Sequence, residues 1–288
     1  MKKLLLITVA SLMAFSAWSQ EADAEAETDS IPTGPWHSEG NFAFIANQSS
    51  YSNWQAGGDN NFSGSINVNY DLNYSKDDWT WDNKFQINYG LTKIKSEKAQ
   101  KTDDRIEINS LLGKQARGLW YYSGFVNFKS QLANGYDPSD RDVKNSHFFS
   151  PAYLQFGPGM LWKKSDNFKV NIAPATARFI FVHGHFTENG DSFGVEQGET
   201  SRFEFGASLS ALYKFDIMEN VSAENKLNLY SNYLEKPENV DIDYELNVVM
   251  QINRFLSTNI AFQTIYDDNA YKGFQIRQMV GLGLNYKF

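Results

Sequence analysis

The sequence predicts an all-β protein: an antiparallel transmembrane up-and-down β-barrel of about twelve strands, with short periplasmic turns and long outer loops. Apolar and polar residues alternate with a period of two along most of the chain, which is typical of strands with one apolar face. These runs match the roughly nine to eleven residues that a tilted strand needs to cross a bilayer. After the N-terminal segment, no apolar run is long enough for a membrane helix. Together the observations favour a membrane barrel over a soluble lipocalin-like or jelly-roll fold.

The alternation is clearest in the C-terminal segment IRQMVGLGLNYKF, where Leu282 and Leu284 lie on the apolar face and Gln278 is the only polar residue on it. Pro158 and Pro174 interrupt two other runs and are expected at bulges or strand ends. The pattern predicts strands at 36–46, 62–75, 79–92, 104–117, 119–132, 151–164, 168–181, 201–215, 219–233, 239–254, 257–267 and 275–288.

The connections between these runs alternate in length. Short connections occur at 76–78 and 118, whereas the segments 47–61, 133–150 and 182–200 are long. Outer-membrane barrels place their short turns in the periplasm and their long loops outside. Both ends of the barrel are therefore expected on the periplasmic side.

Aromatic residues crowd the ends of the predicted strands at the short-turn rim, as in the interfacial girdle of a membrane barrel. The last strand closes with Tyr286 and Phe288. A terminal phenylalanine on an amphipathic strand resembles the C-terminal signal that the barrel-assembly machinery reads. We therefore interpret Tyr286 and Phe288 as an assembly signal, and expect outer-membrane lipids and that machinery as partners.

The first 19 residues have the pattern of a signal peptide. Lys2 and Lys3 precede an apolar stretch at 4–15, and small residues flank Trp18 at the expected cleavage site. An acidic, alanine-rich segment follows, which is typical of a solvated tail. We expect a signal peptide at 1–19, a flexible tail at 20–35 and the barrel domain at 36–288.

Composition excludes several classes of function. The chain contains no cysteine, so disulfides, thiolate metal sites and a catalytic cysteine are excluded. The formal net charge of −8 would become −10 when Lys2 and Lys3 leave with the signal peptide. Without a basic stripe to neutralise phosphates, nucleic acid is not expected as a partner, and no cofactor is expected.

If the apolar face meets lipid, the polar face lines the lumen, and that lumen is charged. Its charges either form an internal ion-pair network or line a polar pathway for a small solute. A barrel of about twelve strands is narrower than the open sixteen-stranded porins. The predicted lumen charges are Arg202, Glu204, Lys214, Glu224, Lys226, Asp241, Asp243 and Glu245.

No catalytic constellation is found in the sequence. A resemblance to outer-membrane phospholipase A would require a serine two residues from a histidine, and none of the four histidines has one at that position. His183 and His185 form an H-x-H pair at the edge of a predicted loop and are candidate metal ligands. On a strand, both side chains would point the same way.

The segment SNWQAGGDN at 52–60 falls in the first long loop. Gly57 and Gly58 favour a tight turn, so the loop is expected to cap or narrow the lumen. A second interpretation is a binding site in which a sugar stacks on Trp54, with Asn53, Asp59 and Asn60 beside it.

The stretches SNWQAGGDNNFSGSINVNYDLNY, WDNKFQINYGL, GLWYYSGFVNFKSQLANGYD and GLGLNYKF resemble a Bacteroidota family known only as a domain of unknown function. The resemblance covers most of the chain after the signal peptide. It implies an outer-membrane barrel and no catalytic residues.

Three functions remain open at this level. The first is a non-enzymatic outer-membrane barrel that acts as a narrow or plugged polar channel, or as an envelope scaffold. The second is a surface barrel that binds a ligand with its long outer loops. The third is a lipid-modifying barrel enzyme.

Overall fold

A computed structural model describes residues 34–50, 60–95, 97–137, 140 and 142–288. The expected signal peptide, almost all of the acidic tail and most of the SNWQAGGDN loop lie outside these residues. Within the part of the chain that the structure describes, no helix combines the length and apolar character required to span a bilayer.

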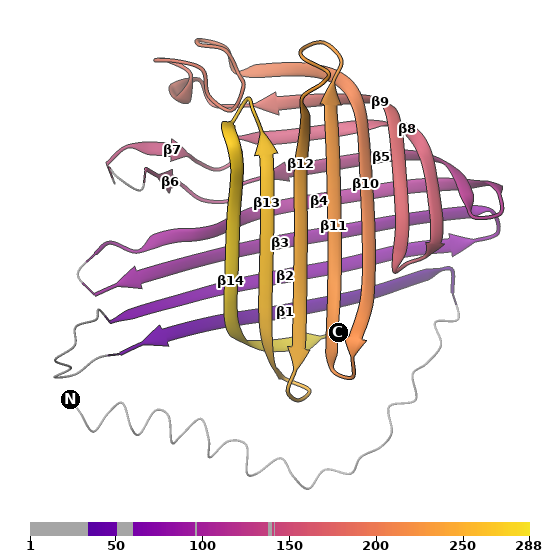
Figure 1. The fold of residues 1–288 in the computed structure, drawn as a ribbon, viewed down its shortest axis with the longest axis horizontal. Coiled ribbons are helices and arrows are strands. Elements are labelled where there is room, and N and C mark those ends of the chain that lie inside the picture. The colour runs from indigo at the N-terminus through magenta and orange to yellow at the C-terminus, as the bar shows by residue number, and fades with distance from the viewer. Residues whose placement is uncertain (1–33, 51–59, 96, 138–139, 141) are drawn as a thin grey trace, which may run out of the picture. The chain divides into compact units, whose positions relative to one another are not determined.

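Twelve antiparallel strands close into a barrel, so the predicted fold class is confirmed (Figure 1). The strands pair in the order β1-β14-β13-β12-β11-β10-β9-β8-β5-β4-β3-β2. Their bounds are β1 Trp36–Ser49, β2 Asn61–Lys76, β3 Trp79–Ile94, β4 Gln100–Arg117, β5 Trp120–Ser130, β8 Ala152–Ser165, β9 Phe168–Phe181, β10 Ser201–Met218, β11 Val221–Asn232, β12 Val240–Gln251, β13 Leu256–Asp267 and β14 Tyr271–Lys287.

Each predicted strand has a counterpart in the barrel, but several bounds differ. Strand β4 begins at Gln100 rather than 104, and β14 begins at Tyr271 rather than 275. The added residues are too few to show a period of two, and pairing with a neighbouring strand extends both strands beyond the predicted runs. The structure also adds a small hairpin, β6 (Gly135–Tyr136) with β7 (Lys144–Ser146), inside the loop 133–150. Strands of two and three residues are too short for a period of two to be detected.

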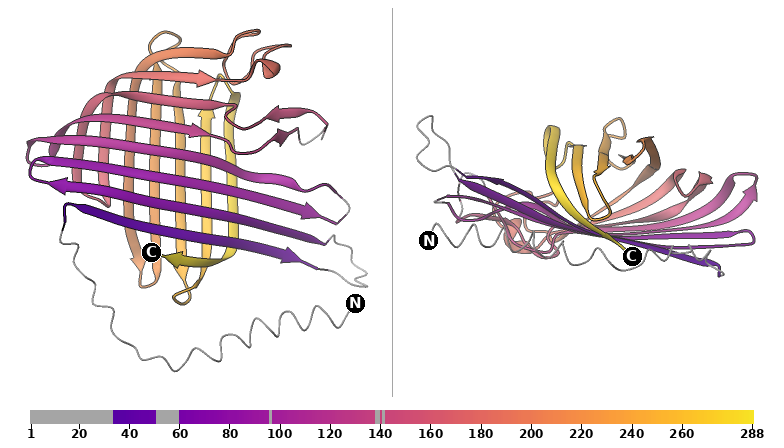
Figure 2. Two further views of the ribbon diagram at one scale, coloured as in Figure 1. Left: turned by 180° about the vertical axis from the view of Figure 1, so that it is seen from behind. Right: turned by 90° about the horizontal axis from the view of Figure 1, so that it is seen from below.

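Turns and loops separate to opposite rims, as expected. Strands β2 and β3 are joined by two residues, whereas the connection between β9 and β10 runs from Val182 to Thr200 and contains the 3-10 turn η2 (Gly184–Phe186). Strand β1 begins, and β14 ends, at the rim with the short turns (Figures 1 and 2). We call the two ends of the barrel the short-turn rim and the long-loop rim.

Pro158 and Pro174 lie where the register between β8 and β9 slips. The paired residues jump from Phe156 to Met160 on β8, so the prolines fall in an irregularity, as expected. The slip also changes which residues of β9 face inward. Odd-numbered residues such as Asn171 are buried before it, and even-numbered ones such as Arg178 after it.

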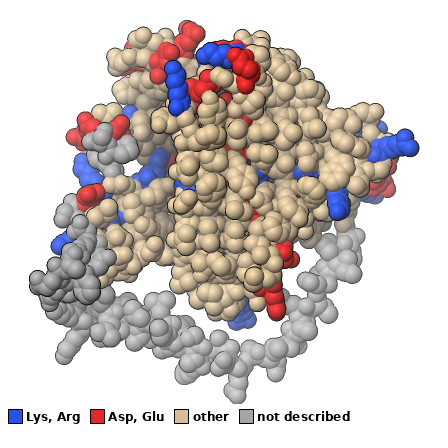
Figure 3. Space-filling view, viewed as in Figure 1, with Lys and Arg blue, Asp and Glu red and all other residues tan. Residues whose placement is uncertain are grey.

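The outward face of the barrel is largely apolar. Large hydrophobic side chains at alternate positions are exposed, for example Ile108 and Leu112 on β4 and Val126 on β5. Figure 3 shows one side of the molecule largely free of charged residues, which gather toward its margins. Aromatic rings of neighbouring strands are in contact at the short-turn rim, including Trp36 with Tyr74 and Phe168 with Tyr213. This arrangement matches an apolar belt bounded by an aromatic girdle.

Candidate functional site

The inward faces of the strands carry polar and charged side chains that meet across the barrel. Strands β3 and β11 lie six places apart in the twelve-strand order and are therefore opposite each other. Lys84 on β3 reaches Glu224 on β11, with Nζ 3.3 Å from Oε2. Glu224 also accepts from Lys214 on β10 at 3.3 Å and from Lys226 at 3.2 Å. Lys214 in turn lies 3.7 Å from Asp71 on the opposite strand β2.

A second bridge crosses the barrel between β4 and β12, which are also opposite. The guanidinium of Arg105 contacts both carboxylate oxygens of Glu245, the second at 3.2 Å. Beside it, Lys226 on β11 donates to Gln86 on β3 at 3.3 Å. Because each bridge joins opposite walls, these ion pairs hold the two sides of the barrel together across the lumen.

The carboxylates of Asp241, Asp243 and Glu245 form a row on the inner face of β12, and each has its own cation. Asp241 pairs with Arg178 on β9 at 2.6 Å and Asp243 with Lys129 on β5 at 3.0 Å, while Glu245 pairs with Arg105. From the sequence alone, the strands next to β12 are the nearest source of cations. The structure instead supplies these cations from β9, β5 and β4, which lie three to six places from β12 in the strand order.

Arg178 is the centre of a charge cluster nearer the long-loop rim. Besides Asp241, its guanidinium lies 3.5 Å from Glu204 and 3.7 Å from Asp267. Glu204 is also 2.9 Å from Nε of Arg202. Sequence reasoning missed Arg178 because the slip at Pro174 reverses the inward and outward positions of β9. All eight predicted lumen charges take part in ion pairs of this kind.

Within the described residues, one group of three carboxylates lies close enough to hold a metal ion: Asp241, Asp267 and Asp268. Arg178 already supplies positive charge to two of the three. The arrangement therefore fits an ion-pair cluster better than a cation site.

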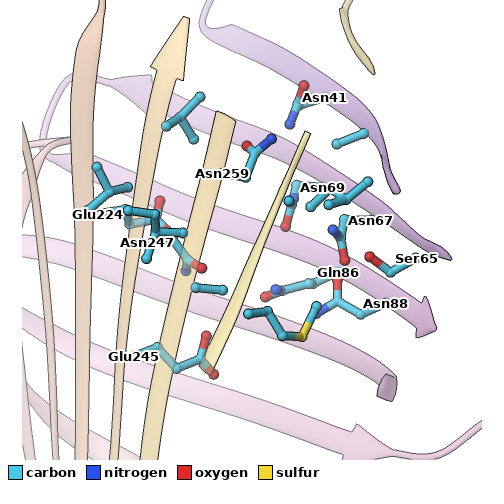
Figure 4. A pocket seen from close by; sticks show the side chains of 18 of the residues that line it. Asn41, Ser65, Asn67, Asn69, Gln86, Asn88, Glu224, Glu245, Asn247 and Asn259 are labelled. Atoms are coloured by element: carbon cyan, nitrogen blue, oxygen red, sulfur yellow. The ribbon is translucent and has the colours of Figure 1, made fainter. Parts of the chain in front are cut away.

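A cavity of about 720 Å³ lies beside these bridges. It runs along the inner faces of β1, β2, β14 and β13 and reaches Glu224 and Glu245 on the far side (Figure 4). Side-chain amides from five strands point into it, as labelled in Figure 4: Asn41, Asn67, Asn69, Gln86, Asn88, Asn247 and Asn259. Sequence reasoning did not single out these amides, although their alternation with apolar residues placed them on the inward face.

Two acceptors in this cavity are left without a partner. The Oδ1 atoms of Asn41 and Asn88 are buried and accept no hydrogen bond from any described residue. Asn88 is only 6 % exposed. A buried unpaired carbonyl oxygen is costly, so the cavity suits water or a ligand that donates hydrogen bonds.

The cavity is accessible at one end and obstructed at the other. Its lining includes Glu39, Asn167 and Lys287, which are exposed at the short-turn rim. Toward the long-loop rim, Arg277 on β14 pairs with Asp103 on β4 at 2.5 Å across part of the lumen. The bore is therefore constricted in the half nearer the long-loop rim.

The loop between β9 and β10 packs at the long-loop rim. Its Val195 is fully buried against Ile180 and Val182. Arg202 donates to the carbonyl of Gly194 at 2.8 Å, and a Cβ on Gly194 would lie 3.3 Å from Asn269, in the loop that follows β13. The loop therefore contributes to closing the barrel at the long-loop rim.

His183 and His185 lie in the connection between β9 and β10 and not on a strand. Strand β9 ends at Phe181, and the two residues lie at the turn η2, where His185 donates its backbone N–H to Nδ1 of His183 at 3.2 Å. Their side chains therefore do not share a strand face. His183 instead packs edge-on against His147, with ring centroids 4.8 Å apart.

The remaining predicted site residues separate into two groups. Asn53, Trp54, Gly57, Gly58 and Asp59 lie outside the described residues. Tyr286 and Phe288 lie where the barrel closes, and their rings stack with centroids 5.9 Å apart. Phe288 exchanges two backbone hydrogen bonds with Gly40 on β1, at 2.7 and 3.0 Å.

A family model described as "Protein of unknown function (DUF3078)" matches residues 46–136. This segment covers β2 to β5 and the end of β1, and includes Lys84, Asn88 and Arg105. No curated protein matches the chain.

Several solved structures of outer-membrane proteins are similar to the chain in fold. An outer membrane channel from Pseudomonas putida F1 is 10 % identical, with a TM-score of 0.41, and the alignment covers 93 % of this chain and 100 % of that one. The outer membrane channel DcaP of Acinetobacter baumannii is 9 % identical, with a TM-score of 0.35 and coverage of 88 % and 97 %. The translocator domain of autotransporter NalP from Neisseria meningitidis is 8 % identical, with a TM-score of 0.34 and coverage of 98 % and 95 %.

Proposed function

We propose that this protein spans an outer membrane and acts as a narrow, internally braced channel for small polar solutes. The observation that carries the proposal is the combination of bridges between opposite walls with a polar cavity open at the short-turn rim. The bridges leave a bore far narrower than that of a sixteen-stranded porin. The short-turn rim faces the periplasm, as in other outer-membrane barrels.

The apolar outer belt supports the membrane location. The exported precursor loses the signal peptide 1–19 under this proposal. The barrel-assembly machinery then recognises Tyr286 and Phe288 and inserts the chain into the membrane. The resemblance of the NWQAGG, WDN and GYD stretches supports the further proposal that the chain belongs to a Bacteroidota family of envelope barrels. The protein acts without a catalytic centre, and its direct surroundings are outer-membrane lipids.

Val126→Lys is expected to destabilise the barrel in lipid vesicles by roughly 2–4 kcal/mol, the cost of a lysine on the lipid face at mid-membrane. Val126 points outward from β5 and is 47 % exposed. The neighbouring Asn127→Lys is the matched control, because Asn127 points inward and its amide is 3.1 Å from Glu107. Urea unfolding of vesicle-refolded protein measures the free energy of unfolding of both variants. Equal losses of stability in the two variants would contradict a lipid-facing β5.

Single-channel recording in a planar bilayer tests conduction. Wild-type protein is expected to give small discrete current steps. Glu39→Gln and Lys287→Gln change opposite charges in the cavity lining at the short-turn rim. The first is expected to shift the reversal potential toward anion selectivity and the second toward cation selectivity, since charged linings concentrate counter-ions.

Heat-modifiable gel migration of the same samples shows that the barrel is folded. A folded barrel that gives no current steps, or two variants with the same selectivity as wild type, would contradict conduction through this cavity.

A further inference from the structure

The seam between β1 and β14 is much shorter than the strands that form it. Strand β1 pairs with β2 over fourteen positions, from Trp36 to Ser49, but with β14 over six, from Asn41 to Ala46. Asn47, Gln48 and Ser49 continue the pairing with β2 and have no described partner on β14. The residues of β14 from Phe274 to Gly281 likewise pair with β13 and not with β1.

The separation follows from a bend in β14. Its last residues run along β1, whereas the rest stands beside β13, steeply inclined to β1 (Figures 1 and 2). Gly281 lies at the point where the strands part, and a Cβ there would overlap the side chain of Ile45. The glycine therefore permits the close approach at which the pairing ends.

The polar cavity continues into this gap. Its lining includes Ile45, Ala46 and Asn47 on β1 and residues 278–281 on β14. Val280 belongs to that lining although its side chain points outward and is 60 % exposed. Gln278, the polar residue on the apolar face, points outward beside it. The cavity thus reaches the outer surface through the wall as well as at the short-turn rim.

An unpaired strand edge at membrane depth is tolerated only where it lines a water-filled space, because backbone N–H and C=O groups cannot be left unsatisfied in hydrocarbon. Here the polar cavity provides that water. The seam is consequently a place where an aqueous, amide-lined space and the lipid phase meet.

We propose that the β1–β14 seam is a lateral portal for a membrane amphiphile with an uncharged, hydroxyl-bearing headgroup. The headgroup enters the cavity and donates hydrogen bonds to the unpartnered oxygens of Asn41 and Asn88, while the acyl chain remains in the lipid. Six acidic and six basic side chains line the cavity, so it offers no net charge to an ionic headgroup. The proposal rests on the membrane location proposed above but not on conduction.

Photo-crosslinking tests the portal in the full chain, reconstituted in phosphatidylcholine vesicles. The probe is a glucosyl diacylglycerol with a diazirine on its sugar, and the control carries the diazirine on a phosphocholine headgroup, which has no hydrogen-bond donor. The sugar probe is expected to label the inner positions near Asn47, Met279 and Asn88. Asn88→Leu is expected to lower that labelling roughly fivefold, the loss expected for one ordinary hydrogen bond.

Closing the seam provides a second readout in this cysteine-free chain. In a continued register Gln48 would face Val280, so a disulfide between Gln48→Cys and Val280→Cys would hold the portal shut. Oxidation is expected to abolish inner labelling and reduction to restore it. The pair Ala46→Cys and Leu282→Cys lies in the part of the seam already paired and is expected to leave labelling unchanged.

Three results would overturn the portal. The sugar probe could label only outward residues, or both probes could label the inner positions equally. The oxidised Gln48→Cys/Val280→Cys protein could also be labelled as fully as the reduced one. Protease protection and heat-modifiable migration of the same vesicles report insertion independently. A barrel that inserts without inner labelling contradicts the portal alone, whereas a chain that does not insert contradicts the membrane location as well.

Discussion

Arg105→Ala is expected to lower the free energy of unfolding by roughly 3–5 kcal/mol, the cost of leaving one partner of a buried ion pair without its counter-charge. The side chains of Arg105 and Glu245 are 7 % and 9 % exposed and join opposite walls of the barrel. Removing the guanidinium leaves Glu245 with only the amide of Gln263, at 3.3 Å, as a described hydrogen-bond donor. Denaturant unfolding in detergent or vesicles measures the loss.

Two controls separate this effect from a general sensitivity to charge. The double variant Arg105→Met with Glu245→Leu removes both charges and is expected to recover most of the lost stability, since buried pairs are often replaceable by apolar residues. The exposed pair Lys98–Asp142 has its side chains 79 % and 91 % exposed, and Lys98→Ala is expected to change stability little. Equal losses for Arg105→Ala and Lys98→Ala would contradict the bracing role.

Gly40→Val is expected to destabilise the barrel by roughly 2–4 kcal/mol, from two seam hydrogen bonds at about 1 kcal/mol each and ring packing of similar size. A Cβ on Gly40 would overlap the ring of Phe288. Displacing that ring disrupts its stacking on Tyr70, at 6.4 Å, and the two backbone hydrogen bonds between Phe288 and Gly40. Because the described seam is short, removing any one of these interactions weakens closure strongly.

The yield of heat-modifiable protein after refolding measures this closure. Phe288→Ala is expected to lower this yield as well. Gly124→Val is the matched control, because Gly124 lies on β5 and a Cβ there meets no other atom within 4 Å. If Gly124→Val lowers the yield as much as Gly40→Val, the loss does not arise at the seam.

The barrel could be predicted from the sequence because every strand presents one face to lipid, and that face must be apolar. Alternation alone identified β9 despite Pro174, and the lengths of the connections placed the turns and loops at opposite rims. Alternation was least informative at strand ends such as Gln100 and Tyr271, where the few added residues do not show a period of two.

The interior could be predicted only in part. The sequence placed Glu224 and Glu245 on the polar face, but their partners Lys84 and Arg105 lie 140 residues away in each case. Which cation meets which carboxylate is set by closure of the barrel, which brings opposite strands together. Arg178 was missed for a local reason, since the slip at Pro174 reverses the faces of β9. The cavity beside the bridges depends on the bend in β14, which no periodicity reveals.

The central claim is that the apolar face of this barrel lies in lipid while its polar face lines a wet lumen. Spin labels on single cysteines along β5, in a chain that has no other cysteine, test it most directly in reconstituted vesicles. Labels at Tyr122, Val126 and Phe128 are expected to collide with dissolved oxygen, which partitions into the bilayer. Labels at Ser123 and Asn127 are expected to collide with a water-soluble nickel chelate. Accessibility that alternates with a period of two would support the account, whereas nickel access at all five positions would contradict it.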